Sequence, residues 1–142
     1  MSVGFKYWDV VLTDIDGTSA IVKNNGTDDN RGVYEINAAT PGTYYFYIDY
    51  NGQLSAKIEN VKIQKTTGNG TLKVVLQYKI RGSWVDGDIN ESYKTNQVLD
   101  YTDVQAAKWN IVKINNVFYG VPIRLSCTVS TAGIISAQVL RS

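Results

Sequence analysis

The chain has 142 residues, with 14 basic and 13 acidic side chains that leave a formal net charge of +1. This balance, without a basic run, argues against nucleic acid and anionic membrane as partners. Histidine is absent, which removes the usual general base and the commonest zinc ligand and argues against an enzyme. The single cysteine, Cys127, excludes a disulfide within the chain and sits in an alternating apolar stretch, as a buried residue would.

The length is that of one ordinary domain, which can bury a core without help from disulfides or metals. Residues 1–9 lack the pattern of a signal peptide, and no stretch approaches ~18 apolar residues, so we expect no membrane helix. Ten tyrosines and three tryptophans, with many threonines and valines, favour sheet. We therefore expect a single domain over residues 1–142, built from strands.

The first third of the chain predicts short strands separated by turns. Residues 7–13 alternate as a first strand, and residues 19–23 predict a short second one. Residues 24–32 contain only turn-forming and charged side chains, which indicates an exposed loop. The alternation resumes over residues 32–36.

Residues 43–50 predict a strand that is aromatic on both faces. Asn51-Gly52 follows, a pair that tolerates the positive φ of a type I′ turn and predicts a hairpin to a strand over residues 54–64. The alternation of this partner strand slips between Ile58 and Val61, which indicates a bulge or a transfer between sheets.

Residues 71–81 predict the central strand. Its apolar residues occupy every second position, and polar residues fill most of the gaps; the apolar set is Leu72, Val74, Leu76, Tyr78 and Ile80. One face should therefore be buried. Since no other segment has a sustained helical period, a second sheet is the expected cover.

Residues 87–107 are the least regular part, and they predict either a functional loop or a hidden short strand at residues 97–101. Residues 108–114 alternate weakly, and Asn115-Asn116 predicts a turn. Residues 103–107 could form a single helical turn.

The last part of the chain predicts two strands joined by a turn. Residues 121–129 give the cleanest alternation in the chain, and Pro122, which cannot donate to a ladder, should begin this strand or lie at a sheet edge. Residues 130–133 predict a turn into a final strand over residues 134–140. The whole pattern is typical of an all-β antiparallel β-sandwich or jelly-roll-like domain of about eight to ten strands.

One segment resembles a calcium loop at its start. Asp86, Asp88 and Asn90 place oxygen ligands at alternate positions. Glu91 then occupies the position that requires glycine, and Gln97 the position that requires a bidentate glutamate. A plain polar turn is the preferred interpretation, and we predict no metal, cofactor or catalytic residue.

Aromatic side chains are the candidate binding residues. Exposed rings on a sandwich can stack on sugars or anchor a protein interface, whereas rings that face inward complete the core. The candidates for a binding surface are Tyr45, Tyr47, Trp84, Tyr93, Tyr101 and Tyr119. Arg124 and Lys108 could lie at an interface too, but the sequence does not separate them from ordinary surface charge.

Two motifs in the second half carry a resemblance. The first is a turn, Gly82-Ser83-Trp84-Val85-Asp86, after the central strand, and the second is the segment PIRLSCTVSTAGIISA near the end, with Ile123, Arg124, Leu125, Thr128, Gly133 and Ser136 as its carriers. This half of the chain resembles small tailed-bacteriophage virion structural β-sandwich proteins, in which the second motif forms a closing hairpin.

The resemblance implies a head decoration, auxiliary capsid or tail component, located in the virion and assembled in the host cytoplasm. Its expected partners are other virion proteins, above all the major capsid protein, and further copies of itself as a homo-oligomer. The first half also resembles prealbumin-like adhesin modules, through Gly32-Val33-Tyr34 and Pro41-Gly42-Thr43-Tyr44. A carbohydrate-binding or host-attachment module, with a glycan as ligand, is the alternative function.

Overall fold

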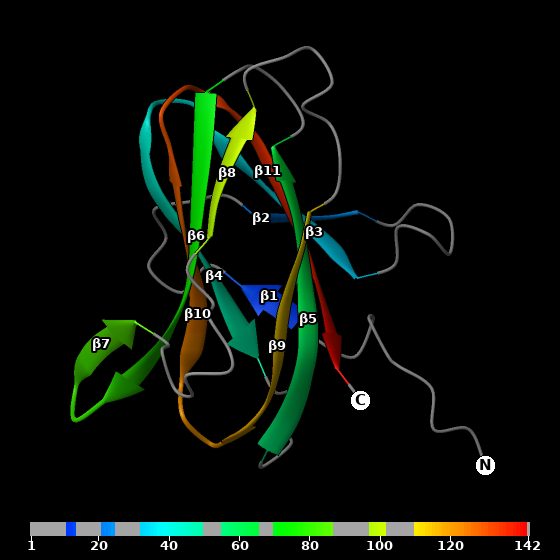
Figure 1. Ribbon diagram of the computed structural model, residues 1–142, viewed down its shortest axis with the longest axis vertical. Coiled ribbons are helices and arrows are strands. Elements are labelled where there is room, and N and C mark those ends of the chain that lie inside the picture. The colour runs from blue at the N-terminus through cyan, green and yellow to red at the C-terminus, as the bar shows by residue number, and fades with distance from the viewer. Residues whose placement is uncertain are drawn as a thin grey trace.

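The computed structural model describes residues 11–13, 21–24, 32–49, 55–65, 70–86, 97–101 and 110–141. These residues form two antiparallel sheets that face each other as a sandwich-like, all-β fold (Figure 1). Within these ranges, no helix is long and apolar enough to cross a membrane.

Each sheet is assembled from strands that are distant in sequence. The first sheet contains β1 (Val11–Thr13), β4 (Gly42–Asp49), β10 (Ile123–Val129), β6 (Gly70–Ile80) and β7 (Ser83–Asp86) in that spatial order, with β8 (Gln97–Tyr101) also paired to β6. The second sheet contains β2 (Ile21–Asn24), β3 (Val33–Ala38), β11 (Gly133–Arg141), β5 (Ser55–Lys65) and β9 (Asn110–Tyr119) in that order.

The core lies between the sheets and follows the predicted alternation. In the first sheet, Leu125 is in register with Phe46 of β4 on one side and with Leu76 of β6 on the other, and all three are buried. In the second sheet, Ile135 faces the core beside its register partner Ile36. Burial of these inward rows supplies the main favourable free energy of folding.

The predicted hairpin between residues 43–50 and 54–64 is wrong. These segments form β4 and β5, which lie in different sheets, so that β4 pairs with β1 and β10 instead. The closing hairpin implied by the resemblance is wrong for the same reason, since β10 and β11 also belong to opposite sheets. Each of these strands has one apolar face. When two consecutive strands join opposite sheets, their apolar faces point toward each other and share one core.

Local irregularities are only partly as predicted. The hidden strand is confirmed as β8, and the slip in the alternation of β5 is confirmed as a register shift against β9 between Ile58 and Asn60. The predicted turn at Asn115-Asn116 is wrong, because β9 runs through both residues. Ile58 pairs with Asn116 and Asn60 with Lys113, so β9 takes three steps where β5 takes two, and a bulge accommodates the extra residue.

Pro122 precedes β10, as predicted, and its carbonyl accepts a 2.9 Å hydrogen bond from the Lys79 amide. Residues 25–31 of the predicted loop over residues 24–32, the predicted turn at residues 51–52 and the predicted helical turn at residues 103–107 lie outside the described residues.

The buried thiol of Cys127 gives a testable prediction. The side chain has no exposed surface, and burial raises its pKa far above the ordinary value of 9.0. We expect no reaction of the folded protein with an aromatic disulfide reagent at pH 8, and complete reaction in guanidinium chloride, because the nucleophile is the exposed thiolate. Rapid labelling of the folded protein would contradict the burial.

The same shift makes stability depend on pH. The unfolded thiol loses its proton near pH 9.0, whereas the folded thiol keeps it. The contribution of Cys127 to the free energy of unfolding is therefore complete below pH 9 and falls as the pH rises further.

Candidate functional site

The outer face of the first sheet carries a row of four polar side chains that spans four strands. Tyr47 of β4 is in register with Arg124 of β10, Arg124 with Gln77 of β6, and Gln77 with Asp86 of β7. Hydrogen bonds join the row. Arg124 Nη1 donates to the Tyr47 hydroxyl at 3.2 Å, Arg124 Nε donates to Gln77 Oε1 at 2.7 Å, and Gln77 Nε2 donates to Asp86 Oδ1 at 3.0 Å.

The guanidinium group of Arg124 stacks on two aromatic rings. Its Cζ atom lies 3.9 Å from the centroid of Tyr45 and 4.1 Å from that of Trp84. Tyr45 precedes Tyr47 by two residues on β4 and so lies on the same face, while Trp84 reaches this face from β7. Tyr45, Tyr47, Trp84 and Arg124 are called the arginine–aromatic cluster below.

Further ring contacts fix the geometry of the cluster. The centroids of Tyr45 and Tyr47 are 6.1 Å apart, and those of Tyr47 and Trp84 are 5.9 Å apart at an interplanar angle of 62°. The Lys79 ammonium lies 5.7 Å from the centroid of Trp84. Such offset and edge contacts are the preferred arrangements of aromatic pairs, and an arginine held by both stacking and hydrogen bonds has few alternative rotamers.

The cluster is suited to recognition rather than to proton transfer. The guanidinium group is only a hydrogen-bond donor, and Arg124, at 9% exposed, already uses two of its nitrogens within the sheet. The described residues include no group of three or more acidic or cysteine side chains placed to hold a metal ion. What the face offers a ligand is a fixed surface of ring edges and polar groups.

Three of the predicted binding residues meet in this cluster. Tyr45 and Trp84 are half-buried and line its surface, whereas Tyr47 is only 6% exposed and contacts both of these rings. The prediction treated all three as candidates for exposure, and the burial of Tyr47 is the departure from it.

The other three candidates do not join the cluster. Tyr93 lies outside the described residues. Tyr101 pairs with Gly70, at the end of β6 opposite to the β7 hairpin, and Tyr119 pairs with Ser55 in the second sheet. The backbone register therefore separates both residues from the cluster.

The residue at the centre of the cluster was not identified from sequence. Arg124 was not separable from surface charge, although its alternation with Ile123 and Leu125 places it on the outward face of a central strand. The signal that could have found it is the pair of motifs already noted, since Trp84 belongs to the first and Arg124 to the second. Asp86, the first residue of the calcium-like segment, instead accepts the hydrogen bond from Gln77.

Comparison of the sequence with protein-family models and with curated proteins gives no match.

Proposed function

We propose that the protein is a noncatalytic bacteriophage virion structural protein that attaches to another virion protein through the outer face of the first sheet. The observation that carries the proposal is the arginine–aromatic cluster. Tryptophan, tyrosine and arginine are the residue types that most often dominate the binding energy of protein interfaces, and they do so where their geometry is fixed before binding.

The surroundings of the cluster favour a protein partner. Exposed polar side chains flank it on the same face, with the Thr43 and Thr128 hydroxyls 2.9 Å apart and Lys73 beside Thr128 in register. A compact aromatic centre with a polar rim is the usual organisation of a protein–protein interface. On a capsid lattice, many such contacts of modest strength add up through avidity.

The glycan alternative has less support from the geometry. Sugar binding by stacking requires an aromatic face that is open to the solvent, but Arg124 occupies a face of both Tyr45 and Trp84. A glycan array separates the two functions, because the virion proposal expects no hits.

We also propose four more specific features that the sequence led us to expect. They are a single jelly-roll-like domain over residues 1–142, the major capsid protein as partner, self-association as a homo-oligomer, and assembly in the host cytoplasm. The alternation of β3, β4, β5 and β6 between the two sheets supports the jelly-roll-like assignment.

The proposal predicts that the chain is present in particles. Particles released by the cell that carries the gene are purified on a density gradient and examined by mass spectrometry. We expect the chain to co-purify at a fixed ratio to the major capsid protein. A chain that is absent from the particles, or a cell that releases none, would overturn the proposed function.

Binding to particles that lack the chain tests the face itself. We expect Tyr45→Ala to weaken binding by about tenfold, a typical effect of truncating an interface aromatic. Asn37→Ala is the matched control, because Asn37 is exposed on β3 in the other sheet. Thermal melts show whether each variant is folded, and equal losses for both variants would contradict the assignment of the face.

A further inference from the structure

The hairpin of β6 and β7 projects from the sandwich (Figure 1). Its two strands pair from Gln77 with Asp86 to Ile80 with Ser83, and the turn consists of Arg81 and Gly82, both with positive φ, at 50° and 82°. This is the backbone of a tight two-residue hairpin, whose twist matches that of its strands. Within the described part of the chain, no strand pairs with the outer edge of β7. Residues 78–85 are called the arm below.

One side of the arm is apolar and becomes exposed to solvent beyond Tyr78, which still packs against the core. Tyr78 and Ile80 continue the inward face of β6, and Val85 is the register partner of Tyr78. Burial decreases along this face, from 1% exposed at Leu76 to 47% at Ile80, with Val85 at 40%. The prediction that Ile80 belongs to the core is therefore wrong, because the arm extends past the facing sheet.

These two side chains stand out within the described residues. Ile80 and Val85 are the large hydrophobic residues that are exposed there, and both are on the same side of one hairpin. Burying an isoleucine and a valine against a partner removes their exposed apolar surface from water, which favours association. Because the two side chains are neighbours on a projecting hairpin, they form one small exposed apolar surface.

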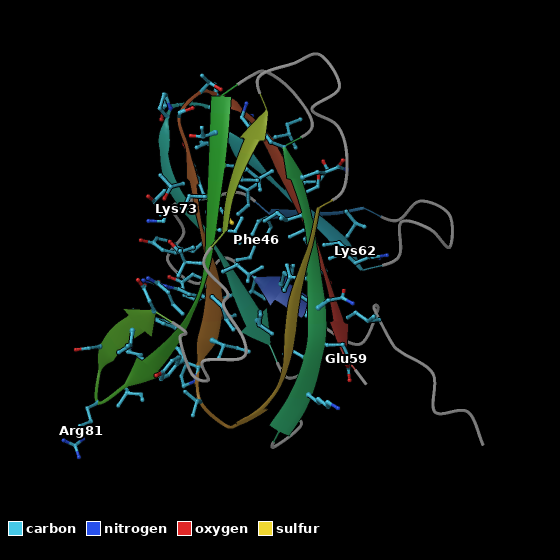
Figure 2. All side chains as sticks on the ribbon, in the orientation of Figure 1. Phe46, Glu59, Lys62, Lys73 and Arg81 are labelled. Atoms are coloured by element: carbon cyan, nitrogen blue, oxygen red, sulfur yellow. The ribbon has the colours of Figure 1, made fainter. Side chains whose placement is uncertain are left out.

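The charge of the arm indicates what kind of surface it fits. Lys79 and Arg81 are exposed cations, and residues 78–85 contain no acidic side chain. Arg81 lies at the tip, pointing away from the body of the protein (Figure 2). Asp86, just beyond the arm, accepts a hydrogen bond from Gln77 at the base of the hairpin. Arg81 at the tip thus borders the apolar pair, whereas Lys79 lies on the opposite side of the hairpin, with its ammonium over the Trp84 ring.

We propose that the arm docks onto a protein surface that presents an apolar patch bordered by carboxylates. Ile80 and Val85 contact the apolar patch, and Arg81 contacts the carboxylates at its border. This inference rests on the proposed function only for the identity of the partner as a virion protein. The contact itself is argued from the residues of the arm. The short turn keeps the arm extended before binding, so little conformational entropy is lost on docking.

Photo-crosslinking from the tip tests the partner chemistry. In the variant Ser83→Cys, which keeps Arg81, a benzophenone maleimide labels the end of the arm selectively among thiols, since Ser83 is exposed and Cys127 is buried. The labelled protein is irradiated with particles that lack the chain, and the crosslinked peptide is identified by mass spectrometry. We expect a peptide of another protein that contains both apolar and acidic residues. A crosslink to a second copy of this chain, or to a segment without acidic residues, would overturn the inference.

Matched variants test the two halves of the contact. We expect Ile80→Ser with Val85→Ser, and separately Arg81→Glu, each to weaken binding to these particles by about tenfold or more. Lys62→Glu is the control, an equal charge reversal on β5 in the second sheet, where Figure 2 shows Lys62 on the side away from the arm.

The outcomes separate the two proposals. If wild-type chain is present in particles and both arm variants bind like the control, the inference fails while the proposed function holds. If the chain is absent from particles, the same crosslinking is performed in the expressing cell. A crosslink there to a protein segment that is both acidic and apolar supports the arm although the virion role has failed, provided that the crosslink is lost in the charge-reversed background Arg81→Glu.

Discussion

Replacing Phe46 with alanine should destabilise the protein by about 3–5 kcal/mol, the usual cost of truncating a fully buried phenylalanine. The ring has no exposed surface and lies between the two sheets (Figure 2), beside its register partner Leu125. The loss combines the transfer free energy of the ring with the cavity it leaves. Because domains of this size are stable by only about 5–15 kcal/mol, the variant should be close to unfolding.

Urea denaturation, followed by circular dichroism, measures this effect as a lower midpoint with an unchanged slope. Phe46→Leu is the matched control, because it keeps most of the buried apolar volume and should cost less than about 1.5 kcal/mol. A loss below about 1 kcal/mol for Phe46→Ala would mean that the two sheets do not meet at this ring.

Replacing Arg124 with alanine should cost about 2–6 kcal/mol, a large effect for a residue on the outer face of a sheet. Two charged hydrogen bonds are lost, to Tyr47 and to Gln77, and each such bond contributes about 1.5–3 kcal/mol before the side-chain entropy is subtracted. The stacking on Tyr45 and Trp84 is lost as well, at about 0.5–1 kcal/mol for each ring.

Arg124→Lys distinguishes this geometry from a simple effect of charge. Lysine keeps the charge but cannot donate from a planar group to both neighbours while lying flat between two rings. We expect Arg124→Lys to lose more than half of the stability that Arg124→Ala loses in the same denaturation experiment. A lysine variant as stable as the wild type would show that the stacked arrangement contributes nothing.

The sequence predicted the inward faces of the strands well and their partners poorly. Alternation alone identified Leu72, Val74 and Leu76 as core, because a strand with one buried face must place its apolar residues at every second position. Asn51-Gly52, by contrast, favours a local turn whichever sheet the next strand joins. The choice between pairing within one sheet and crossing to the other depends on where the whole apolar surface is buried, which no short motif records.

The candidate site was partly predictable for a related reason. Tyr45, Tyr47 and Trp84 could be proposed individually, since aromatic residues off the core face of a strand are unusual enough to be noticed. Arg124 required the register of three strands, because it becomes the centre of the cluster only when β10 lies between β4 and β6. Residues that are 85 positions apart, such as Thr43 and Thr128, are neighbours on this face.

The positions of β10 and β11 affect how the chain reaches its fold during synthesis. Each is flanked on both sides within its own sheet, β10 by β4 and β6 and β11 by β3 and β5, yet both are made after all of these neighbours. A ribosome-bound chain that lacks them has unpaired strand edges in both layers, and such edges are prone to aggregation. Because folding must then pair strands that are far apart in the sequence, long loops have to close. We therefore expect a slow folding time, of about milliseconds to seconds, as in other all-β proteins.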